Sequence, residues 1–495
     1  MKFQRYAKLI LACGMLQGVL SLPAQPAGSI TLRCNDLRQT IDGFGVGEAD
    51  WADDIFIFPK REQVLDALFA PDGLNANILR GEIFPHYATG KLQADFATAS
   101  DTSLHVAQHP EKVERNDLLR RGQFWLTSHV QQKYPEVRFT FSTWSPPAWM
   151  KDGNRATELY PASQGKLKSE HYQHYADYLA DFCEAYNKAG IPIYAVSPSN
   201  EPGYAAPWNS CLWTPQEMGD FIQHNLLPTL QKRNLKVKVL FGENPAWSTV
   251  FDRLKMISSA DFVNNVLQTH ADMPEKNIIA AGHGYVLPDT IPLPAELRRT
   301  PIVPFEEALK RNIPMWVTEI SDITPLDVSM EDGLRWATAF HEYLMEAQVS
   351  AIIWWLGAQP TKTNESLIVL NQQEGSFIKT KRYDTFGNYT RYIPRGSRGM
   401  GNQPNGLPEE VKVSSFRYGN QFTIVVVNPT DRQLTSQLLL ENGKVVKGSL
   451  RNYITTADKQ WSEGTITGST LEFLPQSVTT VSYTHLRAHE TRSNL

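Results

Sequence analysis

Residues 193–202 read Ile-Tyr-Ala-Val-Ser-Pro-Ser-Asn-Glu-Pro, a short apolar run that ends in polar residues. The stretch Pro215–Arg233 follows it with the apolar period of a helix. Short apolar or β-branched runs alternate with longer amphipathic stretches in the same way from about residue 42 to residue 393. Because this alternation is typical of repeated βα units, it predicts a parallel sheet with helices between its strands.

Eight such runs are present, and their number indicates the architecture. The predicted strands are Asp42–Gly47, Ala76–Ile83, Arg138–Trp144, Ile193–Ser199, Val237–Gly242, Ile278–Tyr285, Met315–Ile320 and Ala351–Leu356. The predicted helices include Arg61–Phe69, Asp117–Tyr134, His171–Lys188, Pro215–Arg233, Phe305–Arg311, Met330–Glu346 and Asp384–Ile393. Eight alternations favour an eight-stranded parallel βα (TIM) barrel over an open doubly wound sheet, whose strands are usually fewer.

Beyond Pro394 the apolar period changes to two, and turn-forming residues separate the runs, which predicts an all-β module. The short alternating run at 29–41 has no helix after it, so we expect it to pair with the C-terminal strands. The predicted organisation is a signal peptide at 1–28, an N-terminal strand of the side domain at 29–41, the barrel at 42–393, a β-sandwich side domain at 394–483, and a non-native tail at 484–495. We exclude Ser482–Leu495, which is rich in His and Arg, from the fold.

The N-terminal segment begins with basic residues, continues through the apolar run Leu9–Leu16, and reaches small residues at Ala24 and Ala27. This order is typical of a secretory signal peptide, so we expect an extracellular or periplasmic protein. A lipidated Cys13 is the alternative, and its short distance from Lys8 disfavours it. The apolar run is far shorter than the roughly 20 residues of a spanning helix, so we expect no stable membrane association.

Composition excludes other classes of function. The 495 residues include 48 Lys and Arg and 52 Asp and Glu, and the net charge of −4 offers no general field for nucleic acid. Without the leader, Cys34, Cys183 and Cys211 remain, an odd set without metal-ligand spacing, so neither a disulfide framework nor a zinc site is indicated. We expect a monomer.

Two glutamates close strand patterns. Glu201 follows the fourth predicted strand, and Glu319 lies at the end of the seventh. In a βα barrel these strand ends build the active site, and three strands of separation is nearly across the barrel. Buried carboxylates are costly unless they are paired or functional. The pair therefore matches the arrangement of a two-carboxylate glycosidase, although each Glu alone could equally cap the next helix.

Acetal cleavage explains why two carboxyls are needed. One must deliver a proton to the leaving oxygen, and the other must be ionised beside the developing oxocarbenium ion. Two like charges placed close together separate the two pKa values. This chemistry needs no metal and no organic cofactor, so we expect none.

Five motifs occur in order along the barrel region. They are Trp144–Lys151 (WSPPAWMK), Asn200-Glu201-Pro202, His283-Gly284-Tyr285, Thr318-Glu319 and Phe386–Ile393 (FGNYTRYI). This set resembles glycoside hydrolase family 30 of clan A from about residue 42 to residue 400. The resemblance implies a retaining β-glycosidase on a βα barrel with a side β-domain. Glu201 is similar to the general acid/base of the family, and Glu319 to its nucleophile.

Further polar residues have roles that this chemistry would require. Asn200 can hydrogen-bond the sugar 2-hydroxyl. Arg80 could hold Glu319 ionised by charge pairing, or form a salt bridge at the barrel rim. Tyr285 can donate to the nucleophile, while His283 faces the ligand or is a satisfied histidine at a strand end.

Several aromatic side chains could stack on sugar rings, although most aromatic residues serve core packing. The predicted sugar platforms are Trp144, Trp149, Tyr204, Trp208 and Trp355. The adjacent Trp354 and Trp355 must point to opposite faces of a strand. We choose Trp355, because the family pattern places a tryptophan at the end of this strand.

Other acids receive a different interpretation. Glu48, Asp50 and Asp53 follow the first strand, where a solvated loop is expected. Glu243 ends the fifth strand and is the main rival for a catalytic role, and Asp322 is another, but neither has the family context.

The substrate is the least determined feature. For an exported enzyme with an aromatic loop after Glu201 we expect xylan, cleaved by an endo-β-1,4-xylanase or a related activity. The alternatives are a β-1,6-glycanase, a glucosylceramidase-like enzyme, or a carbohydrate-binding protein without catalysis, which the presence of both carboxyls disfavours. The glucuronoxylan-specific branch of the family has an Arg and Tyr cluster after the eighth strand, and residues 356–362 (LGAQPTK) depart from it. Lys381, Arg382 and Tyr383 could recognise an acidic branch, but a solvated helix start is expected there.

Overall fold

The computed structural model describes residues 28–85, 122–155, 160, 162–248, 257–285, 301–446 and 448–484. The predicted signal peptide, except Gly28, and the predicted tail, except Thr484, lie outside these residues.

Eight parallel strands form a closed barrel. They are β2 (Gly43–Gly47), β3 (Ile78–Glu82), β4 (Arg138–Ser142), β7 (Ile193–Ser197), β8 (Lys238–Phe241), β9 (Ile278–His283), β10 (Met315–Glu319) and β11 (Ala351–Trp354). Each strand pairs in parallel with its neighbours in chain order, and β11 closes the ring on β2. Their β-branched and apolar residues are buried on both faces, with Leu240 and Trp316 in the barrel interior. The predicted TIM barrel is confirmed.

Helices cover the outside of the barrel. They are α1 (Ala52–Phe56), α2 (Arg61–Phe69), α6 (Gly122–Lys133), α7 (Tyr172–Lys188), α8 (Pro215–Phe221), α9 (Leu227–Lys232), α10 (Ser259–Thr269), α11 (Glu306–Lys310), α12 (Met330–His341) and α13 (Lys381–Thr390). The π-helical turn Ile222–Leu226 joins α8 to α9, so that the two form the one helix predicted over Pro215–Arg233. A second π-helical turn, Glu342–Glu346, extends α12. Helix α10 was not among the predicted helices. It begins at the N-cap Ser258, whose hydroxyl accepts a hydrogen bond from the Asp261 amide.

The side domain is a nine-stranded sheet. Its order is β20 (Ser462–Gly468), β19 (Gly448–Thr455), β22 (Ser477–Thr484), β17 (Gln421–Asn428), β16 (Lys412–Tyr418), β15 (Arg398–Asn405), β1 (Gly28–Thr40), β18 (Leu434–Leu440) and β21 (Thr470–Phe473). The N-terminal strand β1 runs antiparallel to β15 and parallel to β18. Strand β22 extends to Thr484, so Ser482, Tyr483 and Thr484 belong to the sheet, and excluding them from the fold was wrong.

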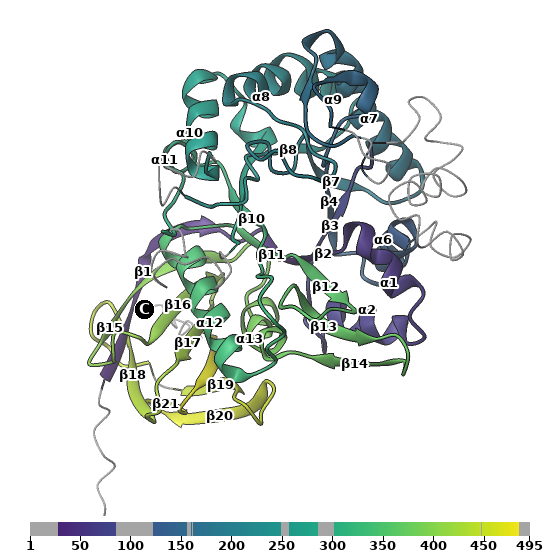
Figure 1. Ribbon diagram of the computed structural model, residues 1–495. Coiled ribbons are helices and arrows are strands. Elements are labelled where there is room, and N and C mark those ends of the chain that lie inside the picture. Colours follow the sequence, from purple (N-terminus) through teal and green to yellow (C-terminus); the bar gives the residue numbers. More distant parts are fainter. Residues whose placement is uncertain are drawn as a thin grey trace, which may run out of the picture.

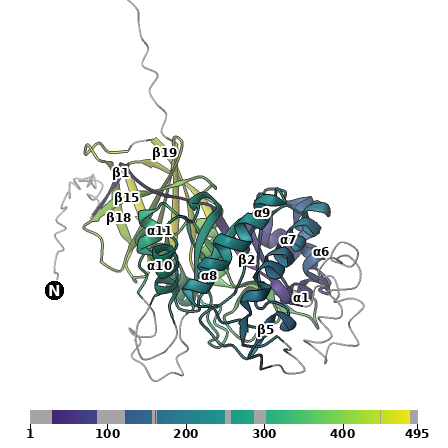
Figure 2. The same ribbon diagram turned by 90° about the horizontal axis from the view of Figure 1, so that it is seen from above.

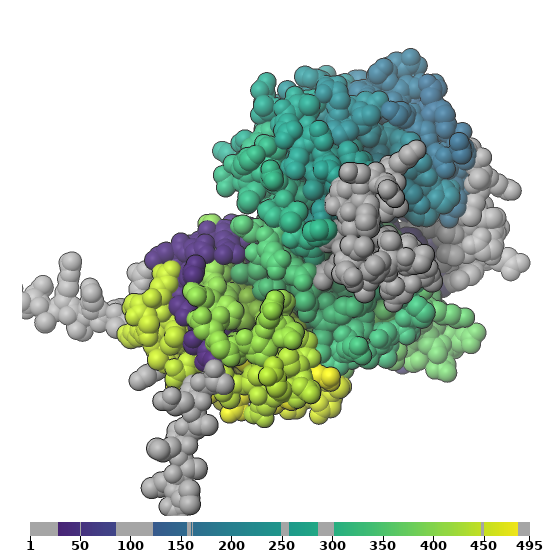
Figure 3. All heavy atoms as spheres, turned by 60° about the vertical axis from the view of Figure 1, so that its left-hand side comes forward, coloured from purple at the N-terminus to yellow at the C-terminus, as the bar shows by residue number. Residues whose placement is uncertain are grey.

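The views agree on how the two parts lie. Figures 1 and 2 show the side domain beside the barrel, and Figure 1 shows α12 and α13 next to the side-domain strands. In Figure 3 the purple residues of β1 lie against the yellow-green C-terminal strands. Ile30 and Leu32 from the first strand and Val481 from the last share one apolar core.

Helix α13 holds the two parts together. The Asn388 side chain donates to Thr480 Oγ1 at 3.1 Å and accepts from Thr455 Oγ1 at 2.6 Å. Gly387 lies under the Trp461 indole, and a Cβ there would come within 2.1 Å of the ring. The segment Phe386–Ile393, which carried part of the family resemblance, therefore serves the contact between the two domains.

The residues after β11 form a small sheet that the sequence did not predict. It consists of β12 (Leu356–Gln359), β13 (Ser366–Asn371) and β14 (Ser376–Lys379), and a short two-stranded ribbon joins β5 (Lys151–Asp152) to β6 (Lys166–Leu167). Across the described ranges, no helix combines the length and the apolar character needed to cross a bilayer.

Candidate active site

Glu201 and Glu319 lie at the C-terminal ends of two barrel strands. Glu319 is the last residue of β10, and Glu201 follows β7 in the next loop. Both side chains are buried, and one carboxylate oxygen of Glu201 lies within 4.8 Å of one of Glu319. The two strand ends therefore bring the two carboxyls together.

Arg80, at the centre of β3, connects this pair to its surroundings. Its Nη1 lies 2.6 Å from Glu319 Oε1, and its Nη2 donates to Asn200 Oδ1 at 2.8 Å and to Glu243 Oε1 at 3.2 Å. The guanidinium is fully buried. One cation thus pairs with two carboxylates and orients the side-chain amide of Asn200.

Tyr285 and His283 face the same pair from the end of β9. The Tyr285 hydroxyl donates to Glu319 Oε2. His283 Nδ1 lies 3.3 Å from Glu201 Oε1 and 3.5 Å from Glu319 Oε2. Burial, and secondly the charge of Arg80, lower the pKa of His283 well below its usual value, so the ring is neutral near pH 7 and these contacts are not ion pairs. We refer to Arg80, Glu201, Glu243, His283 and Glu319 as the carboxylate centre.

The surroundings raise the pKa values of both Glu201 and Glu319, but groups near Glu319 oppose the rise there. Burial, followed by the negative charge of Glu319, raises the pKa of Glu201 well above its ordinary value. Burial also raises the pKa of Glu319, to about 7, but the Arg80 charge and the Tyr285 hydrogen bond oppose the rise. Glu201 therefore keeps its proton at a pH at which Glu319 has lost its own.

Two of the predicted aromatic platforms border the centre. The Arg80 guanidinium carbon lies 5.2 Å from the ring centroid of Trp144 and 5.9 Å from that of Trp355, within cation–π range. Trp354 instead packs on Trp336 of α12, outside the barrel strands. Of these two adjacent tryptophans, Trp355 therefore lies beside Arg80 and Trp354 lies against α12.

The other predicted platforms lie in outer loops. Trp149 is 57% exposed, and its ring lies 5.2 Å from His171 and 6.2 Å from His174 at the start of α7. Tyr204 and Trp208 form an edge-to-face pair in the loop after Glu201. Trp149 and Trp208 are therefore exposed, and Tyr204 is half-buried beside Trp208.

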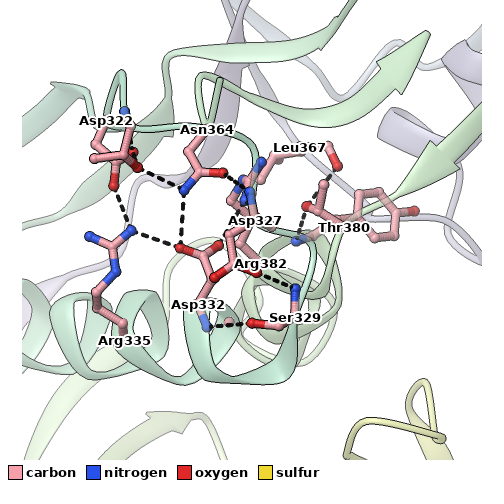
Figure 4. Close-up of polar contacts among 12 residues, drawn as sticks. Asp322, Asp327, Ser329, Asp332, Arg335, Asn364, Leu367, Thr380 and Arg382 are labelled. Atoms are coloured by element: carbon pink, nitrogen blue, oxygen red, sulfur yellow. Dashed lines mark hydrogen bonds and ion pairs between the residues drawn. The ribbon is translucent and has the colours of Figure 1, made fainter. Parts of the chain in front are cut away.

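Asp322 lies three residues after Glu319 but belongs to a different set of contacts (Figure 4). It pairs with Arg335 at 2.5 Å and accepts from the Thr324 amide at 3.1 Å. Asp332 pairs with Arg335 and with Arg382, each at 2.7 Å. We refer to Asp322, Asp332, Arg335, Asn364 and Arg382 as the α12 network. These contacts of Asp322 therefore hold its own loop to α12.

Two interpretations were given for Lys381, Arg382 and Tyr383: recognition of an acidic branch, or a solvated helix start. Both are wrong for Arg382 and Tyr383. Arg382 is fully buried in the α12 network, and Tyr383 is fully buried with its hydroxyl donating to the Ala67 carbonyl at 2.6 Å. Lys381 pairs with Asp384 at 2.9 Å. All three already have partners within the fold.

The acids after the first strand also differ from expectation. Glu48 and Asp53 are buried and not solvated. The Glu48 carboxylate accepts from the Ala358 amide at 3.0 Å, and burial raises its pKa well above the usual value. The side chain of Asp50 lies outside the described residues.

Lys151 connects several loops through hydrogen bonds, a role that was not predicted from the sequence. Its buried ammonium donates to Ser145 Oγ and to the carbonyl oxygens of Ala162 and Ser210, each at 2.7 Å. Burial lowers its pKa to about 8. The loop after β4 is thereby tied to the loop that follows Glu201. A lysine that closes the WSPPAWMK motif was visible in the sequence, but its three acceptors come from separate loops.

Glu201, His283 and Glu319 also have a spacing that a metal ion could use. Each offers one ligand atom, and the three atoms lie within 4.8 Å of one another. One imidazole and two carboxylates are common zinc ligands, but Arg80 at 2.6 Å from Glu319 opposes an added cation. Chemistry without a metal or an organic cofactor stays a prediction.

Comparison with known proteins gives a consistent result. Residues 116–369, about half of the chain, match the sequence profile of O-Glycosyl hydrolase family 30. The chain is 25% identical over 492 residues to the glucuronoxylanase XynC of Bacillus subtilis (strain 168), covering 95% of this chain and 96% of that protein. It is 29% identical over 213 residues to the endo-1,6-beta-D-glucanase of Neurospora crassa, covering 41% and 42% of the two chains. The catalytic domain of GH30 xylanase C from Talaromyces cellulolyticus superimposes with a TM-score of 0.72 at 21% identity, over 92% of this chain and all of that one.

Proposed function

Because the chain belongs to O-glycosyl hydrolase family 30, it is a glycoside hydrolase, and we propose that it works by double displacement between Glu201 and Glu319. The observation that carries this proposal is the separation of the two carboxyls, whose oxygens approach within 4.8 Å. Retaining glycosidases have their carboxyls roughly 5 to 5.5 Å apart, whereas inverting enzymes need about 6.5 to 9.5 Å to admit a water molecule.

In the first step the ionised Glu319 attacks the anomeric carbon and forms a glycosyl ester. The bond from that carbon to the leaving oxygen breaks, and Glu201 gives its proton to this oxygen. Arg80 holds Asn200 by its amide oxygen, which leaves the amide nitrogen of Asn200 free to donate to the sugar 2-hydroxyl.

In the second step a water molecule attacks the same anomeric carbon and releases Glu319. Glu201, now ionised, accepts the water proton and returns to its starting state. The two displacements leave the product with the configuration of the substrate.

We propose xylan as the substrate class. The full-length similarity to a glucuronoxylanase supports this proposal, as do the exposed Trp208 and its partner Tyr204 after the acid/base. Dependence on a uronate branch is not part of it, because Lys381, Arg382 and Tyr383 have partners inside the fold. A β-1,6-glucan is the second candidate, favoured by the similarity to the Neurospora enzyme.

We also propose that the protein is exported. The order of basic, apolar and small residues in the first 28 positions supports a cleaved leader. Expression in a secreting bacterial host, followed by N-terminal sequencing, tests this proposal. Mature protein starting after residues 24–28 is expected in the periplasm or medium, and a full-length chain kept in the cytoplasm would contradict it.

The decisive experiment follows the anomeric configuration of the product by NMR. Wild-type enzyme is incubated with xylan, glucuronoxylan, β-1,6-glucan, β-1,6-galactan and glucosylceramide, and the first product signal is expected to be the β-anomer from xylan. A first product with the α-configuration would overturn double displacement. Cleavage of a non-xylan member alone would overturn the substrate class and leave the mechanism standing.

A further inference from the structure

Glu243 is a fully buried carboxylate that the double displacement does not use. It follows β8 after Gly242, and its φ of 29° lies in the left-handed region that residues other than glycine rarely adopt. Such a backbone conformation is retained only where the surroundings fix it, and it is concentrated at functional sites.

The side chain of Glu243 reaches the nucleophile through Arg80. Glu243 Oε1 accepts from Arg80 Nη2 at 3.2 Å, while Nη1 of the same guanidinium lies 2.6 Å from Glu319 Oε1. The Ser142 hydroxyl lies 3.1 Å from Glu243 Oε1 and 2.9 Å from Oε2 and holds the carboxylate from the other side. Both oxygens of Glu243 are thus in use by the protein.

The backbone of Glu243 reaches the acid/base directly. The Glu201 amide donates to the Glu243 carbonyl at 3.0 Å, and Glu201 also has a left-handed φ, of 49°. The Glu243 amide in turn donates to the Ala281 carbonyl of β9 at 2.9 Å. The two unusual backbone turns therefore support each other.

We propose that Glu243 is the positioning residue for both catalytic carboxyls, holding Glu319 through Arg80 and Glu201 through the main chain. This inference rests on the proposed function for the roles of Glu201 and Glu319. It assigns to Glu243 no contact with the substrate.

The negative charge of Glu243 has a second effect. It contributes, after burial and after Glu319, to raising the pKa of Glu201, and it also raises the pKa of Glu319. The other groups facing these carboxyls are Arg80, the neutral His283 and the Tyr285 hydroxyl. Removing the Glu243 charge should therefore lower both pKa values together.

The test compares Glu243→Gln with two other variants. Ser142→Ala removes one hydrogen bond to Glu243 and keeps its charge. Asp322→Asn removes the charge of an equally buried, arginine-paired carboxylate that belongs to the α12 network. For each variant, kcat/KM is measured against pH with an aryl β-xyloside, and the titration of Glu201 and Glu319 is followed by NMR on protein labelled with ¹³C at the glutamate carboxyls.

For Glu243→Gln, we expect both limbs of the pH profile and both carboxyl titrations to move about 1 pH unit toward acid. At the optimum, kcat/KM should fall about 10- to 100-fold because the geometry loosens. Ser142→Ala should lose activity less and keep its pH limits, and Asp322→Asn should keep wild-type activity and pH limits.

Wild-type pH limits and titrations in a folded Glu243→Gln protein would overturn the inference. Covalent labelling of Glu243 by a 2-deoxy-2-fluoro glycoside would overturn it too, by making Glu243 the nucleophile. The NMR titration needs no turnover, so it tests Glu243 even if the enzyme cleaves no xyloside, a result that would count against the proposed substrate only.

Discussion

The carboxylate centre and the α12 network both pair arginine with buried carboxylates, but they differ in the supply of hydrogen-bond donors. In the α12 network, Arg335 and Arg382 serve Asp332, and Asp322 accepts from Arg335 and from the Thr324 amide. Each carboxylate oxygen of these two aspartates has a donor. In the carboxylate centre a single arginine is shared between two glutamates.

The atoms left over in the centre show what this shortage means. Within the described residues, Glu201 Oε2, both ring nitrogens of His283 and Arg80 Nε are buried without a hydrogen-bond partner, whereas in the α12 network this holds for one nitrogen of Arg382. Native proteins satisfy nearly all of their buried polar atoms, so a cluster of exceptions requires a reason. A satisfied network holds loops in place, whereas an unsatisfied one keeps carboxyls available for proton transfer and attack.

The largest expected effect is a loss of activity when Glu319 of the carboxylate centre is replaced. Glu319→Gln should lower kcat/KM for an aryl β-glycoside by at least about 10⁴-fold, because no nucleophile remains. Its melting temperature should equal or exceed that of the wild type, since a buried charge is removed. Steady-state kinetics and thermal melts check both points. Turnover at the wild-type rate would remove Glu319 from the mechanism.

The reverse pattern is expected in the α12 network. Asp332→Asn should lower the free energy of unfolding by about 3 to 5 kcal/mol, because Arg382 is left buried without its carboxylate. Activity per folded molecule should change less than about twofold. Urea unfolding and active-site titration measure the two quantities. A loss of turnover without a loss of stability would contradict the contrast between the regions.

The pH dependence of stability should come from the centre. The pKa of Glu319 is raised from 4.5 to about 7 in the folded protein, so folding favours its protonated form. This contribution is complete below about pH 4.5 and is lost as the pH rises through about 7, on the order of 3 kcal/mol. Unfolding measured at pH 4.5 and pH 8 should show this loss in the wild type and in Asp332→Asn, and a smaller one in Glu319→Gln. Equal losses of unfolding free energy in all three proteins would show that Glu319 is not the source of the pH dependence.

The smallest effect distinguishes the arginines of the two regions. Arg80→Lys should lower kcat/KM about 10- to 100-fold, because one ammonium cannot hold Glu243 and Glu319 in a fixed geometry. Since the nucleophile loses part of its cationic partner, its pKa rises and the acidic limb of the pH profile moves to higher pH. Arg335→Lys is the matched control and should leave the profile unchanged. If the acidic limb shifted in Arg335→Lys and not in Arg80→Lys, Arg335 and not Arg80 would be the arginine that controls the pKa of Glu319.

The sequence was informative where local pattern and burial coincide. All eight barrel strands follow from predominantly apolar runs, because a strand covered on both faces is mostly apolar, and Arg80 within β3 is an exception whose charge is paired inside the barrel. Glu201 and Glu319 stand out for the same reason, as acids that close such runs. Helix α10 was not among the predicted helices, although it has 11 residues and a buried apolar face, and the strands of the sheet β12, β13 and β14 were missed because they have only 4 to 6 residues each.

Contacts between distant strands could not be predicted in the same way. Arg80 was linked to Glu319 from the sequence, but its hold on Glu243 depends on β3 and β8 converging inside the barrel. Lys381–Tyr383 looked like a solvated helix start because charged residues usually lie outside, and the burial of Arg382 depends on Asp332, about fifty residues earlier. Tertiary pairing decided these positions, and single-sequence periodicity carries no signal of it.

The place of β1 has a consequence for how the chain is made. Arg33 in β1 hydrogen-bonds Gln403 in β15, 370 residues later, and the remaining neighbour of β1 is β18, further along still. During synthesis β1 has no partner until the whole barrel has emerged. Such long-range pairing is slow to form and leaves an open strand edge exposed to aggregation. Truncation of the C-terminal strands should therefore yield chains that accumulate in inclusion bodies even though the barrel sequence is intact.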